Sequence, residues 1–168
     1  MNKTLKLSMI ALLAILSTGV KAQEASETAN GTARVKLRKA LAIEEKTEMD
    51  FATVTLGTGA GTVSVGENGS LTPSGDYTTA GPGSAGEFTI TGPASQVLNI
   101  DYTNGVLKSS ASGATEIPVE ITGDPSLTLT DTGIAELTVT GELSFEGNEP
   151  DGDYSTENGT PYTVTVSY

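Results

Sequence analysis

The stretch that most clearly decides the fold class is Tyr162-Thr163-Val164-Thr165-Val166-Ser167-Tyr168. Apolar and polar residues alternate through it without a break. Because successive side chains of a β-strand point to opposite faces, the tyrosines and valines share one face and the hydroxyl residues share the other. The pattern predicts a half-buried strand, which either closes a sandwich or lies beside an open position that a partner strand can fill.

The same period of two recurs along the rest of the chain. Leu98, Ile100 and Tyr102 alternate with polar residues, and other stretches repeat the pattern. About nine or ten short strands follow one another at intervals of roughly 8–12 residues, and no convincing helix follows the N-terminal apolar run. This spacing predicts an all-β fold, an antiparallel β-sandwich.

Glycine, proline and asparagine mark the ends of the predicted strands. Asn68-Gly69 and Asn104-Gly105 are typical hairpin turns. Residues 72–86 and 146–160 are rich in small and polar residues, and we expect long loops there. Gly141 interrupts an otherwise regular apolar face, which indicates a β-bulge at that position.

The first 22 residues are predicted to be a secretory signal peptide. Lys3 and Lys6 precede the short apolar run 9–17, and Val20-Lys21-Ala22 provides small residues at the cleavage positions. The apolar run is far shorter than the ~20 residues that span a bilayer, so no membrane span is expected.

Export divides the remaining chain into a leader and a domain. Residues 23–32 are polar and acidic, and we expect them to be a disordered leader. Residues 33–168 are then the β-sandwich domain. The expected location is the periplasm, the cell surface or the cell exterior.

The charge of the exported chain is strongly negative. Removal of residues 1–22 takes away Lys3, Lys6 and Lys21, so the nine basic residues fall to six against 21 acidic ones, and the net charge becomes −15. Such a surface repels nucleic acid and anionic lipid, and it suits basic partners or cations. Nucleic-acid binding is therefore not expected.

The residue types of many enzymes and metal sites are missing from this chain. It contains no Cys and no His. Without them no Ser-His-Asp or Cys-His nucleophile and no His- or Cys-ligated zinc site can form. No pair of carboxylates stands out either, so we expect no catalytic residues, no enzyme activity and no cofactor.

Most of the basic residues of the exported chain lie in one short segment. Within Ala33–Ile43, the apolar residues Val35, Leu37, Leu41 and Ile43 fall on one face, which only Lys39 interrupts, and basic residues occupy much of the other. Good helix formers in KLRKALAIEEK also allow a helix, but the period of two favours a strand. The pattern predicts a strand with a basic outer edge. It is either the first strand of its own closed, monomeric sandwich or a strand donated to a neighbouring copy.

Four stretches, in this order along the chain, resemble a known family. They are EMDFATVTLG (residues 48–57), GEFTITGP (86–93), LTVTGELSF (137–145) and the ending PDGDYSTENGTPYTVTVSY. Together they resemble the secreted bacterial family called domain of unknown function 4402, although Ala52 stands where the family usually has Gly. The family resembles chaperone–usher pilins and spore-coat-U-type subunits, which are immunoglobulin-like sandwiches. The resemblance therefore implies a pilin-like, immunoglobulin-like β-sandwich with a non-enzymatic structural or adhesive role at the bacterial cell surface.

The resemblance and the residues together name a candidate partner site. A pilin-like subunit adds a strand from a neighbouring copy or a periplasmic chaperone beside its C-terminal strand. The donor face would be Val35, Leu37, Leu41 and Ile43, and the residues bordering the acceptor would be Tyr162, Val164, Val166 and Tyr168.

The alternative function is a monomeric binding module. Its loops 72–86 and 146–160 would bind a carbohydrate, a protein or Ca²⁺. Asp151, Asp153 and Glu157 are the weak candidate calcium ligands, because oxygen donors in a glycine-rich loop suit this ion. Their spacing does not match an EF-hand, so an acidic, solvated turn explains them equally well.

Overall fold

The computed structural model describes residues 30–37, 39–111, 113 and 115–168. Residues 37–168 form one compact unit and residues 1–36 belong to another. Residues 30–36 are exposed and lie in no strand. The predicted signal peptide, residues 1–22, and most of the predicted leader lie outside the described residues.

The described part of the unit 37–168 consists of β-strands and contains no helix. The strands are β1 (Ala42–Thr47), β2 (Thr53–Thr55), β3 (Gly61–Val65), β4 (Leu71–Pro73), β5 (Thr78–Ala80), β6 (Gly86–Thr91), β7 (Val97–Thr103), β8 (Gly105–Ser109), β9 (Glu116–Gly123), β10 (Ser126–Thr128), β11 (Ile134–Phe145), β12 (Tyr154–Thr160) and β13 (Thr163–Ser167). Every strand pair is antiparallel. The predicted all-β, antiparallel fold class is confirmed.

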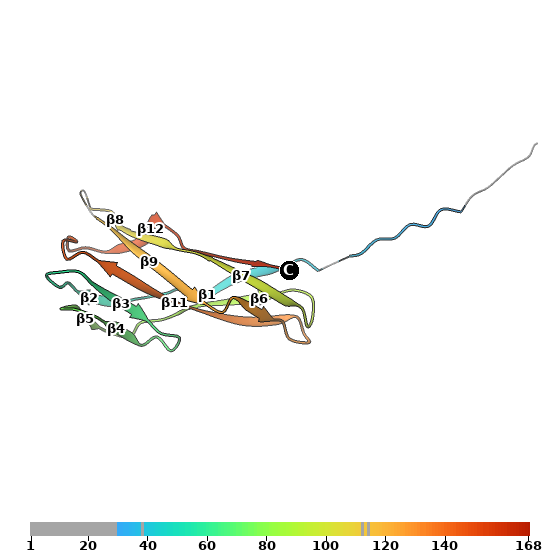
Figure 1. Ribbon diagram of the computed structural model, residues 1–168, viewed down its shortest axis with the longest axis horizontal. Helices are drawn as coiled ribbons and strands as arrows, with labels where there is room; N and C mark the ends of the chain where they lie inside the picture. Colours follow the sequence, from blue (N-terminus) through green and yellow to red (C-terminus); the bar gives the residue numbers. More distant parts are fainter. Residues whose placement is uncertain (1–29, 38, 112, 114) are drawn as a thin grey trace, which may run out of the picture. The chain divides into compact units, whose positions relative to one another are not determined.

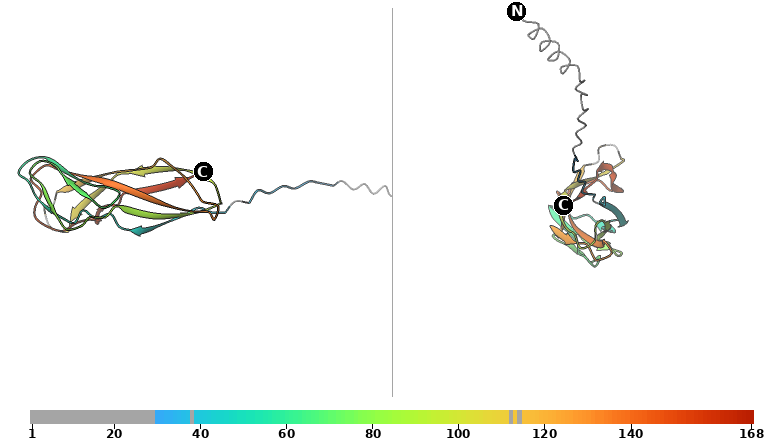
Figure 2. Two further views of the ribbon diagram at one scale, coloured as in Figure 1. Left: turned by 90° about the horizontal axis from the view of Figure 1, so that it is seen from below. Right: turned by 90° about the vertical axis from the view of Figure 1, so that its right-hand side faces the viewer.

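Two sheets form the sandwich (Figures 1 and 2). The larger sheet has the strand order β1-β6-β11-β9-β8-β12, with β3 also paired to β11 and β4 paired to β3. The smaller sheet has the order β10-β7-β13, and β2 and β5 form a separate two-stranded ribbon. Apolar side chains from the two sheets share one core, in which Leu98 on β7 and Val139 on β11 are fully buried.

The long strand β11 shows how alternation builds this core. Leu137, Val139, Leu143 and Phe145 are buried on one face, as their spacing predicts. Gly141 shares that face but makes no bulge, because it pairs in register with a neighbour on each side. A Cβ at this position would lie 2.6 Å from the Met49 Sδ. A side chain at position 141 would therefore require the Met49 side chain, in the segment before β2, to move.

One of the two hairpins predicted from Asn-Gly turns is present in the structure. Asn68-Gly69 joins β3 to β4, and Gly69 has the positive φ of 75° that this turn requires. Asn104-Gly105 does not make a hairpin, because β7 belongs to the smaller sheet and β8 to the larger one. The Asn104 Oδ1 instead accepts a hydrogen bond from the Ile121 backbone N–H at 3.1 Å, which fixes the point where the chain changes sheets.

The two predicted long loops contain strands. Residues 72–86 include most of β4 and all of β5, and Ser84 makes a β-bridge with Asp50. Residues 146–160 include β12, which pairs with β8 at the end of the larger sheet. These strands are short or polar and are held largely by backbone pairing. They therefore lack the apolar alternation that indicates a half-buried strand in a sequence.

The predicted strand at Ala33–Ile43 is wrong over most of its length. The first strand, β1, begins at Ala42, and the described residues before Leu41 lie in no strand. Leu41 and Ile43 are partly buried against the core, whereas Val35 and Leu37 are 81% and 86% exposed. The alternation continues upstream of Leu41, but the sheet does not, because no strand of this unit pairs with those residues.

Ala52 holds a left-handed backbone conformation, with φ of 52°. A Cβ disfavours this region by roughly 1–2 kcal/mol, so we expect Ala52→Gly to raise the free energy of unfolding by about 0.5–1 kcal/mol once the extra freedom of glycine is subtracted. Urea unfolding measures it. The control is Ala80→Gly in β5, which should lower the free energy of unfolding. An equal decrease for Ala52→Gly would contradict the claim that the Ala52 backbone is strained.

Candidate functional site

Two sheet edges lie beside each other in this sandwich. In the described residues β13 pairs with β7 alone, so its other edge is open, and β1 pairs with β6 alone. The Tyr162 hydroxyl donates to the Glu45 Oε1 at 3.2 Å, and the Tyr168 hydroxyl donates to the Lys39 carbonyl at 2.8 Å. The two strands therefore run in opposite directions. Side-chain hydrogen bonds link them in place of a ladder of backbone hydrogen bonds.

A narrow cavity separates these two edges. Its volume is about 280 Å³, and Ile43 and Val164 line it from opposite sides, with Phe88 and Tyr162. Each of these side chains also packs against the hydrophobic core. Open strand edges present unpaired N–H and C=O groups and can accept another strand.

A larger hollow continues from the narrow cavity and shares Glu45, Thr156 and Tyr162 with it. Its volume is about 920 Å³. One wall is the segment 45–56 and the other is formed by residues 150–157. Apolar side chains of the larger sheet make its floor, and they are Leu107, Ile117, Val119, Leu143 and Phe145. We call the two connected spaces the edge groove.

The rim of the edge groove is acidic. Six exposed carboxylate side chains line the larger hollow, and they are Glu45, Glu48, Asp50, Asp151, Asp153 and Glu157. No lysine or arginine is among the described residues of this lining. An apolar floor under a rim of one charge sign favours an elongated ligand with apolar and cationic groups.

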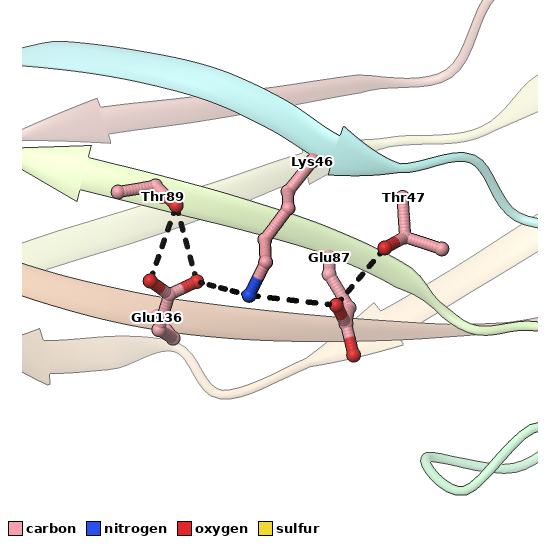
Figure 3. A network of polar contacts seen from close by, with 5 residues as sticks. All are labelled: Lys46, Thr47, Glu87, Thr89 and Glu136. Carbon is pink, nitrogen blue, oxygen red and sulfur yellow. Dashed lines mark hydrogen bonds and ion pairs between the residues drawn. The ribbon is translucent and has the colours of Figure 1, made fainter.

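The lysine of β1 is held away from this rim, on the outer face of the larger sheet (Figure 3). The Lys46 Nζ lies 3.8 Å from the Glu136 Oε2 and 4.0 Å from the Glu87 Oε2. The Thr47 and Thr89 hydroxyls donate to the same two carboxylates, at 3.0 and 3.1 Å. These exposed ion pairs stabilise the fold by only about 0–1 kcal/mol each, but they engage Lys46 outside the groove.

Tyr162 lies where the two parts of the edge groove meet. Its ring packs edge-on against Phe88, with the ring centroids 6.4 Å apart. Burial and the negative charge of Glu45 raise the pKa of the Tyr162 hydroxyl above its ordinary value, so it remains a proton donor. Tyr162 thus links the β13 side of the groove to β1.

The structure brings together only part of the predicted partner site. Val164 and Val166 are half-buried on the core face of β13, as predicted, and Tyr168 is 43% exposed. Ile43 joins Tyr162 and Val164 around the narrow cavity. The exposed Val35 and Leu37 contribute to neither cavity.

The predicted calcium ligands line the rim of the edge groove. Asp151, Asp153 and Glu157 are all exposed there. Across the described residues, no group of three or more acidic side chains is placed to hold a metal ion. Nothing in this loop supports a calcium site.

Glu149 is the carboxylate that organises the acidic loop, and sequence reasoning missed it. Only 8% exposed, it accepts the backbone N–H groups of Glu146 and Gly147 at 2.6 and 2.9 Å. Its neighbours in the sequence include several other acids, so nothing in the pattern distinguishes it. Only the folded turn shows that this carboxylate points inward.

The comparisons with known proteins identify a family. The family model described as "Domain of unknown function (DUF4402)" matches residues 41–168. The chain belongs to the domain of unknown function 4402 family. The match begins at Leu41, a residue that packs against the core, so both walls of the edge groove lie within the family domain. The search of curated proteins found no match.

The described residues also contain no helix long and apolar enough to cross a membrane.

Proposed function

We propose that this protein is a secreted, non-enzymatic structural subunit of the bacterial cell surface, which associates by strand addition. The observation that carries the proposal is the pair of open edges of β1 and β13 beside the apolar-floored edge groove. An extended strand placed there would find backbone partners on the edges and pockets for alternate side chains. The strand would come from another copy or from a periplasmic chaperone.

Two further features support this role. The exposed segment before β1 carries apolar and basic residues in alternation, the pattern of a strand that could pair with the edge of another sheet. The fold is a β-sandwich, the architecture of pilin-like and immunoglobulin-like subunits, and the sequence predicts export. Adhesion would then depend on the assembled subunits.

A second function is favoured by the same groove. A closed monomer could use the acidic rim to bind a basic ligand, with residues 150–157 as one wall. This version keeps the predicted role of the acidic loop in binding. The two functions differ in whether the protein associates with itself.

Self-association of the exported chain, residues 23–168, is the test. We expect size-exclusion chromatography with light scattering to show a mass that rises with protein concentration, and unboiled gel electrophoresis to show a ladder. Removal of residues 23–40 should abolish both and leave the circular dichroism spectrum of the sandwich unchanged. A constant monomer mass up to about millimolar concentration would favour the monomeric binding module.

A further inference from the structure

We propose that the edge groove of one copy takes residues 33–37 of a second copy. Val35 and Leu37 would lie toward the apolar floor, and Arg34 and Lys36 would lie toward the acidic rim. The inference rests on the proposed self-association, to which it adds the identity of the donated strand and the charges that recognise it.

The donor is available because the domain leaves it uncovered. Residues 33–37 are exposed and lie in no strand, and the two large apolar side chains among them, Val35 and Leu37, are 81% and 86% exposed. In an extended strand, Val35 and Leu37 share one face and Arg34 and Lys36 share the other. The segment therefore carries an apolar face and a cationic face without any help from its own domain. Leu41 and Ile43 are not available, because they pack against their own core.

The acceptor has the opposite charge and a matching floor. Six carboxylates surround the larger hollow, and Lys46 is engaged on the outer face of the sheet. Five extended residues span about 17 Å, and β13, the strand that borders the groove, also has five residues. Two cations entering a rim of six anions would relieve part of the repulsion among those anions.

The positions of donor and acceptor favour a chain of copies. The segment that leads into β1 lies beside Tyr168, at the end of β13, because the Tyr168 hydroxyl donates a hydrogen bond to the Lys39 carbonyl (Figure 1). The larger hollow lies beyond the other end of β13, past Tyr162. A contact between two different surfaces of the same molecule is heterologous, and when repeated without closing it builds a filament.

The charges make the contact sensitive to salt. The Debye length falls from about 10 Å at 0.1 M salt to about 3 Å at 1 M, so attraction between exposed rim and donor charges weakens strongly over this range. The apolar contacts of Val35 and Leu37 do not depend on salt in this way. Association should therefore weaken with salt and still respond to changes at these two residues.

Charge reversal on each side tests the inference in the full exported chain. The donor variant is Arg34→Glu/Lys36→Glu and the acceptor variant is Asp151→Lys/Asp153→Lys. At about 50 mM NaCl we expect sedimentation velocity to show self-association at least about tenfold weaker in each variant. Mixing the two variants should restore association, because the intact donor of the acceptor variant then meets the intact rim of the donor variant, and the reversed donor meets the reversed rim.

The matched control is Glu67→Lys/Asp131→Lys, which changes the net charge by the same amount at exposed acids outside the groove lining. It should self-associate as the parent protein does, because its donor segment and its rim are both intact. Self-association that survives both reversals unchanged would overturn the inference and leave the proposed function standing. A parent protein that stays monomeric at every concentration would overturn both the inference and the proposed function. This includes a monomer whose own residues 33–37 fill its own groove.

Discussion

The double substitution Val164→Asp/Val166→Asp is expected to unfold the protein or leave it barely stable. Both valines lie on the core face of β13 and pack against the hydrophobic core. Each change removes about 1–2 kcal/mol of apolar burial and adds about 1–3 kcal/mol for a poorly hydrated carboxylate. Together these losses, about 4–10 kcal/mol, match the whole stability of a typical domain. Urea unfolding followed by circular dichroism measures the effect.

A control on the opposite face of the same strand separates burial from charge. Thr163 and Ser167 are exposed and lie opposite Thr103 and Asn99 of β7, so aspartate at both adds two charges without facing Asp101. Thr163→Asp/Ser167→Asp should keep the domain folded, with a loss of about 1 kcal/mol or less. Equal stability of the two double variants would refute the assignment of a core face to β13.

The second large effect is expected at Glu149. Burial raises the pKa of its carboxyl, but hydrogen bonds from backbone N–H groups of residues 146–149 outweigh this and lower the pKa below its ordinary value of 4.5. We expect Glu149→Gln to lower the free energy of unfolding at pH 7 by about 1–3 kcal/mol, because the amide can no longer accept these bonds as an anion and brings a donor toward buried donors.

The pH dependence of this loss has a definite sign. A carboxyl whose pKa is lower in the folded than in the unfolded state stabilises the fold fully above pH 4.5, and this contribution is lost as the pH falls through the lower, folded-state pKa. The stability difference between the parent protein and Glu149→Gln should therefore be constant from pH 7 to about 5.5 and shrink below pH 4.5.

Urea unfolding of both proteins between pH 3 and 7 checks this expectation. Glu67→Gln, at an exposed position, provides the control, because it removes one carboxylate and leaves the hydrogen bonds to Glu149 intact. A difference that stays the same down to pH 3, or one that Glu67→Gln reproduces, would contradict the role given to Glu149.

Several strands could be predicted because the alternation of apolar and polar side chains follows directly from which face is buried. The alternation in β7, β9 and β13 follows from one buried face and one exposed face, and the buried residues are those expected. β12 escaped prediction, because Tyr154–Thr160 is polar and is held by backbone pairing to β8. The strand predicted at Ala33–Ile43 failed for the converse reason. Its alternation is real, but no strand of this domain pairs with its first part.

The candidate site was predictable only on one side. The pattern of Tyr162–Tyr168 indicated a strand that could border a partner, and the structure places it at the open edge of the smaller sheet. The acidic rim was not visible, because its members come from two distant segments, 45–50 and 151–157. The aspartates that suggested a calcium loop belong to this rim, while Glu149 turns inward and organises their loop.

By itself the sequence determined the β-sandwich class, the inner and outer faces of the main strands, the acidic charge and the absence of histidine and cysteine chemistry. These properties depend on single residues or their nearest neighbours. Tertiary structure alone decided which strands are partners, where the sheets remain open and which carboxylates face each other. The physical reason is that strand pairing joins backbones far apart in sequence, and side-chain alternation says which face is buried but not which strand lies beside it.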